Sequence, residues 1–182
     1  MAWITLNEVK AVMETQSTEH DNLINILIPA VKNLFITKSG YDPQQATVTE
    51  KFESNNNDRI VLSRSPLTAI THIKIHYGSS TITLTEDEYI AYKKGIIVFD
   101  SRITGVVEIQ YTAGYIDTEI PEDITNVIIL QVIDFVEKGG RLGVQSTGKM
   151  GESITYKDIP LLPEFELVCN LYNNPIPNRE TL

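Results

Sequence analysis

The sequence predicts an α+β protein, in which a bundle of about four helices carries a β-rich antiparallel insertion between the second and third helices. Helical spacing of apolar residues in residues 1–40 is the first of three observations behind this class. The period changes to strand alternation in residues 46–113, and helical spacing returns after Pro121. A length of 182 residues favours one domain, so we expect a single domain over residues 1–182.

Residues 1–40 predict the N-terminal helices. Thr5 and Glu8 have capping-box spacing, which predicts that a short helix begins just after Thr5. A second run with helical spacing extends to about Thr37, and Gly40 is suited to end it. Pro29 lies inside this run and removes one backbone hydrogen bond, so we expect a bend near Asn25–Pro29 or two shorter helices.

Residues 46–113 predict the β-rich insertion. The stretch TAITHIKIHYG, residues 68–78, alternates as a half-buried strand does. Turns are predicted at the polar cluster 55–58, at 93–95 and over 101–105, because these stretches carry Asn, Asp, Ser and Gly or a Lys-Lys-Gly step. Several short strands joined by turns indicate an antiparallel meander or a small barrel.

The last third of the chain predicts a central helix over residues 121–138, which begins at Pro121 and has acids in its first turn. Its apolar residues exceed one narrow stripe, so we expect this helix to be covered on most sides. A flexible arm is predicted over residues 139–159, which are rich in Gly, Ser and Thr. Residues 160–182 predict a C-terminal helix, beginning near Pro163, and a tail.

Composition restricts the possible functions. The net charge is −9 and no basic run occurs, which argues against a protein that wraps nucleic acid by neutralising phosphates. The single cysteine, Cys169, excludes an internal disulfide and a cysteine-based zinc site, and its apolar neighbours predict a buried thiol. No signal peptide and no membrane span is predicted, so we expect a soluble, non-secreted protein.

None of the motifs that could carry chemistry indicates an enzyme, a bound cofactor or a metal site. Gly143–Met150 fits G-x-x-x-x-G-K, but Met150 stands where a phosphate loop needs Ser or Thr. His72 and His76 share a strand face at a spacing of roughly 13 Å, too far for one metal to bridge. The acidic stretch 85–88 lacks the spacing of a calcium loop, and no G-x-S-x-G is present.

The junction between the last predicted strand and the central helix is the most informative feature. Tyr111 and Tyr115 bracket Ala113-Gly114, and Pro121 follows six residues after Tyr115. We expect the two tyrosines to hold the end of the sheet on the bundle, and Gly114 to allow a turn that a side chain would obstruct. Pro121 is expected to start the helix.

These segments, in this order, resemble a family of phage proteins. ITLNEVKAVMET and the following helix through residue 41 are similar to its N-terminal helix pair, and IVLSRSPLTAITHIKIHYG with DEYIAYKKGIIVF is similar to its strands and hairpin. EIQYTAGYIDTEIPEDITNVIILQVIDFVEK is similar to its sheet-to-helix segment. The chain thus resembles, over most of residues 4–172, the head-tail connector (adaptor) proteins of tailed double-stranded DNA bacteriophages.

The resemblance implies a structural protein of the virion neck, assembled in the host cytoplasm as a ring, commonly of twelve copies, on the portal protein. Such a ring extends the channel through which DNA passes without sequence-specific binding, and contacts a downstream neck or tail-completion protein. Candidate residues for the oligomer or portal interface are Val127, Leu130, Phe135, Leu161, Phe165 and Tyr172. The alternative is another non-catalytic virion component, for attachment or in the tail, with a ligand-binding β-module.

Overall fold

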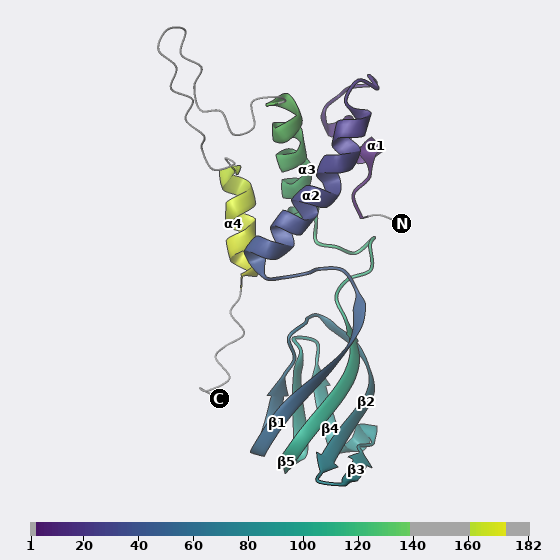
Figure 1. Cartoon of the computed structure of the whole chain (residues 1–182), viewed down its shortest axis with the longest axis vertical. Coiled ribbons are helices and arrows are strands. Elements are labelled where there is room, and N and C mark those ends of the chain that lie inside the picture. Colours follow the sequence, from purple (N-terminus) through teal and green to yellow (C-terminus); the bar gives the residue numbers. More distant parts are fainter. Residues whose placement is uncertain (1–2, 139–160, 174–182) are drawn as a thin grey trace. The chain divides into compact units, whose positions relative to one another are not determined.

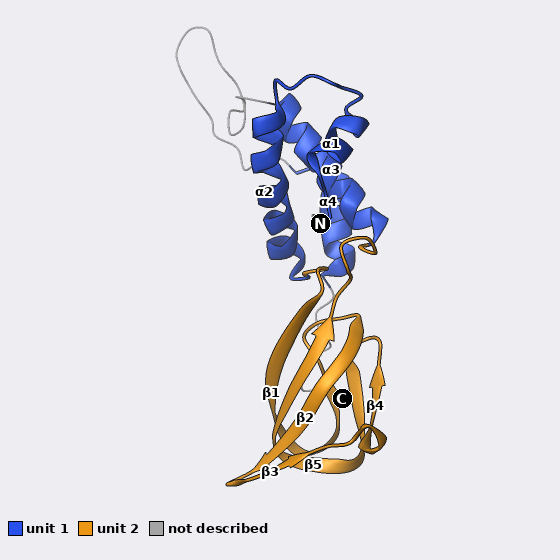
Figure 2. Cartoon of the chain, turned by 90° about the vertical axis from the view of Figure 1, so that its right-hand side faces the viewer, with its two compact units in different colours: residues 1–41, 121–174 blue, residues 42–120, 175–182 orange. Residues whose placement is uncertain are grey.

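The computed structural model describes residues 3–138 and 161–173. The predicted arm at 139–159, the Gly143–Met150 motif and the tail from residue 174 lie outside these residues. The chain divides into two compact units (Figure 2): a helical unit, Met1–Tyr41 with Pro121–Asn174, and a sheet unit, Asp42–Ile120 with Pro175–Leu182. The described residues contain four α-helices and one five-stranded antiparallel sheet, which confirms the mixed α+β class. The single-domain organisation stays a prediction.

The helical unit contains α1 (Leu6–Val12), α2 (Asp21–Ser39), α3 (Glu122–Glu137) and α4 (Pro163–Tyr172), as Figure 1 shows. The capping box at the start of α1 is confirmed, because Glu8 N donates to Thr5 Oγ1 and Thr5 N donates to Glu8 Oε2. The end of α2 at Gly40 is also confirmed, and Gly40 has the left-handed φ of 66° that glycine adopts readily.

Of the two alternatives predicted around Pro29, the division into two shorter helices is wrong, and the bend stays a prediction. A single 19-residue helix runs through Pro29, whose side chain is exposed. The buried residues Ile24 and Ile28 precede the proline, and Val31 and Phe35 follow it on the same packed face. Packing on both sides of the proline therefore maintains the helix, although the proline removes one backbone hydrogen bond.

Aromatic residues join α2 to α4 inside the helical unit. The Phe35 and Phe165 rings meet edge to face with centroids 6.1 Å apart, and both residues are fully buried. The Tyr172 ring stacks on that of Tyr41 at 5.2 Å. At the N-terminal end of the unit, Trp3 is buried with the Lys32 ammonium 4.7 Å from its ring centroid.

The sheet unit contains β1 (Ala46–Val61), β2 (Leu67–Tyr77), β3 (Ser80–Thr83), β4 (Tyr89–Tyr92) and β5 (Ile96–Ala113), with a short 3-10 helix, η1 (Glu86–Glu88), before β4. The strand order is β1-β5-β2-β3, and β4 pairs with the first part of β5. Ile73, Ile75, Val107 and Ile109 alternate into the core, as the period of two predicts. The strand pattern of TAITHIKIHYG is thus confirmed.

Two of the predicted turns are wrong. β1 continues through residues 55–58 and β5 continues through 101–105, and the two strands pair on both sides of the interrupted register. The asparagine cluster instead contains register shifts, and Asn56 adopts a positive φ of 63°. A β-bulge absorbs the residues that favour turns, and bends the strand without ending it. The turn at 93–95 is confirmed, with Gly95 at a φ of 80°.

Candidate functional site

Gly114 lies where the chain leaves the sheet unit, directly after β5. It has a φ of +102°, which L side chains rarely adopt. A Cβ atom at this position would lie 2.5 Å from the Gln44 carbonyl oxygen, so the incoming segment occupies the space that a side chain would need. Two backbone hydrogen bonds of 2.8 Å hold this approach, from Tyr115 N to Pro43 O and from Gln45 N to Tyr115 O. The turn at this junction therefore depends on glycine.

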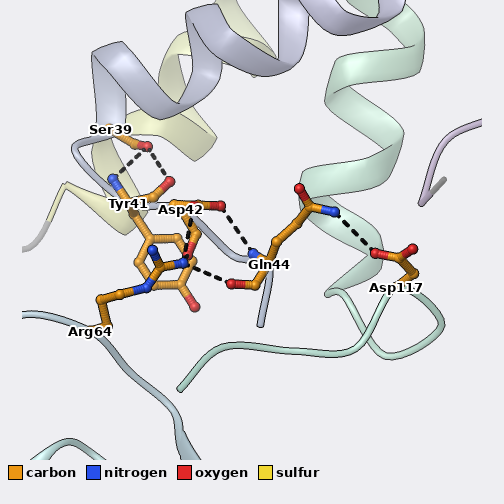
Figure 3. Close-up of polar contacts among 6 residues, drawn as sticks. All are labelled: Ser39, Tyr41, Asp42, Gln44, Arg64 and Asp117. Atoms are coloured by element: carbon orange, nitrogen blue, oxygen red, sulfur yellow. Dashed lines mark hydrogen bonds and ion pairs between the residues drawn. The ribbon is translucent and has the colours of Figure 1, made fainter. Parts of the chain in front are cut away.

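A polar network surrounds the same end of the sheet unit (Figure 3). Arg64 Nη2 donates to Asp42 Oδ2 at 2.9 Å and to the Gln44 carbonyl oxygen at 2.7 Å. Gln44 Nε2 in turn donates to Asp117 Oδ1 at 3.1 Å, which joins the incoming segment to the outgoing one. Hydrogen bonds of these residues thus link three connections of the sheet unit: the one before β1, the one after β1 and the one after β5.

Tyr111 is a core residue of the sheet unit. Its side chain is fully buried among the strands, and its hydroxyl donates to Glu50 Oε1 at 2.8 Å. The Ser63 hydroxyl and backbone amide also donate to Glu50. Burial raises the pKa of Tyr111 to about 12, because the phenolate would lose hydration and lie beside a carboxylate. The contact of Tyr111 and Tyr115 with the helices stays a prediction.

In the helical unit, the end of α2 is closed by a local contact that Figure 3 also shows. The buried Ser39 hydroxyl donates to the Phe35 carbonyl oxygen at 2.7 Å and accepts from Tyr41 N at 3.1 Å. At the other helical boundary, Pro121 occupies the N-cap position of α3. The carboxylates of Glu122 and Asp123 lie in the first turn, as predicted, near the positive end of the helix dipole.

The candidate interface residues of α3 and α4 differ in exposure. Val127, Phe135 and Phe165 are buried in the core of the helical unit. Leu161 and Tyr172 are half-buried, and the Tyr172 hydroxyl donates to Asp123 at 3.1 Å. Leu130 is 42% exposed and so can contact another molecule directly. The interface role of all six residues stays a prediction.

Gln131 is a buried polar residue that sequence reasoning missed. It is fully buried in α3, and its Oε1 accepts from Leu162 N at 2.8 Å at the start of α4. Its Nε2 donates to Asp134 Oδ2 at 3.3 Å. Its position inside the apolar stretch VIILQVI, residues 127–133, is the signal that could have identified it.

The two β2 histidines approach one carboxylate on the polar face of the sheet. His72 Nε2 lies 3.7 Å from Glu108 Oε1, and His76 Nε2 lies 3.8 Å from Glu108 Oε2. Lys51 Nζ, 3.0 Å from the same carboxylate, lowers the pKa of Glu108. In residues 3–138 and 161–173 no group of three or more metal-ligating side chains could hold a metal ion. In the same residues no helix is long and apolar enough to cross a membrane.

The fold is similar to that of two chains in solved particles. One chain, in the neck of an empty gene transfer agent (GTA) particle computed with C6 symmetry, has 12% identity and a TM-score of 0.56, with 84% of each chain covered. The other, in the virion of a native GTA particle, has 11% identity and a TM-score of 0.54, with 88% of this chain and 92% of that chain covered. No curated protein matches in sequence. The model of the head completion protein family matches residues 2–172, and the chain therefore belongs to this family.

Proposed function

We propose that this chain is a structural protein of the neck of a phage-like particle, where it joins the head to the tail. Membership of the head completion protein family over residues 2–172 is the observation that carries the proposal. The fold shared with a chain in the neck of a GTA particle supports it. The helical unit acts as a bundle that carries the sheet as an insertion, since α2 and α3 flank the five strands in the chain.

The proposed assembly is a ring, of twelve copies, docked on the portal protein. A ring closes through contacts between two different surfaces of each copy, and the described surface offers exposed apolar side chains for such contacts. The net charge of −9 suits a channel wall along which DNA slides without binding, because like charges repel. The ring also presents a surface to a downstream neck or tail-completion protein.

The role is non-catalytic, and the protein functions in the virion neck after assembly in the host cytoplasm. The polar groups that approach one another in the described residues serve the fold. Glu50 accepts from Tyr111 and Ser63 inside the sheet unit, and Arg64 joins its connections. Cys169, a possible nucleophile elsewhere, is buried, and burial raises the pKa of its thiol to about 11.

The test is complementation of particles that lack this chain. Heads filled with DNA but without tails are expected to accumulate, and adding the purified protein is expected to restore tail attachment. Heads assembled without portal are the control and are expected not to bind the protein. Electron microscopy with a tag on the chain is expected to show density between head and tail.

Density at the far end of the tail would favour the alternative, an attachment component, and would refute the neck assignment. Normal tail joining in the absence of the chain would refute it equally. Because a portal can template ring formation, a monomer in isolation decides nothing, and the measurement needs portal-bearing heads.

A further inference from the structure

The outward face of one part of the sheet is apolar, although the opposite face already forms the core. β4, the first part of β5 and the last part of β1 pair side by side, and Tyr92 and Val61 both pair with Ile96. Ile90 pairs with Val98 in the next outward row. Directly paired residues point to the same side of a sheet. The outer apolar face therefore consists of Val61, Ile90, Tyr92, Ile96 and Val98, and the exposed Arg59, which also pairs with Val98, lies at its margin on β1.

This face is accessible. Ile90 is 55% exposed and Tyr92 is 50% exposed, while Val61, Ile96 and Val98 are half-buried. The alternate residues of the same strands, Ile60, Ile97 and Phe99, are buried in the core. An antiparallel sheet usually has one polar, solvated face, so a sheet that is apolar on both faces indicates that something covers the second one.

The charges around the outer apolar face differ at its two ends. Lys93 and Lys94 are exposed and follow Tyr92 directly, so one end is basic. The acids of η1, residues 86–88, precede β4 at the other end, roughly 13 Å away along the strand. One of them, Glu88, accepts hydrogen bonds from the Thr85 amide and hydroxyl at 2.7 Å. The basic end can therefore attract carboxylates of a partner surface.

A surface of the complementary kind lies on α4. Leu167 and Leu171 are 60% and 66% exposed, and they share one side of the helix with the exposed Glu164. We call Glu164, Leu167 and Leu171 the α4 stripe. The sequences of α3 and α4 contain four and two acidic residues, six together, and no lysine or arginine. Lys38 pairs with Glu166 at 3.0 Å and Lys138 pairs with Asp134, so the carboxylate that the stripe itself presents is Glu164. The stripe is thus apolar with one acidic end, and the sheet face is apolar with a basic end.

We infer that the outer apolar face of one copy packs on the α4 stripe of the neighbouring copy, with Lys93 and Lys94 beside Glu164. This inference rests on the ring assembly proposed above and identifies the contact that closes it. One chain carries both surfaces, and a contact between two different surfaces leaves one of each available for the next copy. Apolar centres with opposite charges at the margin fix the register of such contacts.

Cysteine cross-linking between two variants tests the contact. Ile90→Cys and Leu171→Cys are prepared separately, mixed, assembled on portal-bearing heads and treated with a short bis-maleimide. A mixed cross-link, stronger than either self-cross-link, is expected. The buried Cys169 remains in place because its side chain is 2% exposed. Matched controls are Ile82→Cys in the sheet unit and Ile26→Cys in α2, which are 52% and 68% exposed and lie outside both surfaces.

Charge exchange gives a second, independent measurement. Lys93→Glu with Lys94→Glu is expected to weaken association about tenfold, because the attraction of both lysines to Glu164 is lost and replaced by repulsion. Adding Glu164→Lys to the same chain is expected to restore part of that loss. Sedimentation velocity over a range of concentrations, or binding to heads, measures both effects.

Three outcomes would overturn the contact. They are a dominant Ile90–Ile90 cross-link, control cross-links as strong as the mixed one, and no mixed cross-link in copies that have assembled on heads. If the copies assemble on heads in any of these cases, the contact is wrong while the neck function stands. If the wild-type chain neither joins heads nor self-associates, the proposed function fails and the contact fails with it.

Discussion

Gly114→Ala is expected to destabilise the protein by about 3 kcal/mol. The positive φ costs about 1–2 kcal/mol for a residue with a Cβ. The new Cβ would lie 2.5 Å from Gln44 O and 2.9 Å from Gln45 Cα, and these are backbone atoms that cannot rotate away. Moving them disrupts the two 2.8 Å bonds between this segment and Tyr115, at about 1 kcal/mol each. The lower entropy of the unfolded chain offsets about 0.5–1 kcal/mol.

Gly78→Ala is the matched control, because Gly78 also has a positive φ, +58°, but no atom lies within 4 Å of its Cβ position. It is expected to cost about 1 kcal/mol from backbone strain alone. Urea denaturation followed by far-UV circular dichroism measures both free energies of unfolding. Equal losses at Gly114 and Gly78 would refute the reasoning, because the close approach of Gln44 would then contribute nothing.

Three further changes have defined outcomes. Gln131→Leu leaves the Leu162 amide without its acceptor and is expected to cost about 1–3 kcal/mol in thermal unfolding. Gln131→Glu retains an acceptor but buries a second carboxylate beside Asp134, so at pH 7 it should lower the melting temperature more. Tyr111→Phe removes a hydrogen bond to the Glu50 carboxylate and is expected to cost about 1–3 kcal/mol in urea; no change would mean that the bond is not formed in solution. The pKa of Tyr111 is about 12 in the folded protein and about 10 in the unfolded chain, so the unfolded chain loses its proton first as the pH rises. The free energy of unfolding should therefore fall between pH 10 and pH 12 in the wild type, and less steeply in Tyr111→Phe. Cys169 should react with a thiol reagent at pH 8 only when urea unfolds the chain, and fast labelling of the native protein would contradict its burial.

Helix ends were predicted well because their signals are local. The Thr5–Glu8 capping box, Gly40 at the end of α2 and Pro163 at the start of α4 each act within a few residues, and the structure confirms all three. The alternative of two shorter helices at Pro29 failed because packing by distant residues stabilises α2, and a propensity scale contains no information on that packing.

The asparagine cluster at 55–58 shows the same limitation in the sheet. Its composition favours a turn, but pairing with β5 continues beyond it and converts the turn signal into a bulge. The outer apolar face could have been identified, since Ile96–Phe99 has no polar residue in alternation, the pattern of a strand covered on both faces. The approach of His72 and His76 to Glu108 could not be predicted, because it depends on which strands are neighbours.

The direct pairing of Ala46 with Ala113 brings together the two ends of the insertion. About 80 residues separate the end of α2 from the start of α3, but once β1 and β5 pair, only about 14 of them remain as a flexible path. By the logarithmic dependence on loop length, this shortening lowers the loop-closure cost of bringing α2 against α3 by roughly 1.5 kcal/mol. The sheet therefore promotes folding of the helices through chain connectivity alone, and a variant that delays β1–β5 pairing should also delay helix packing.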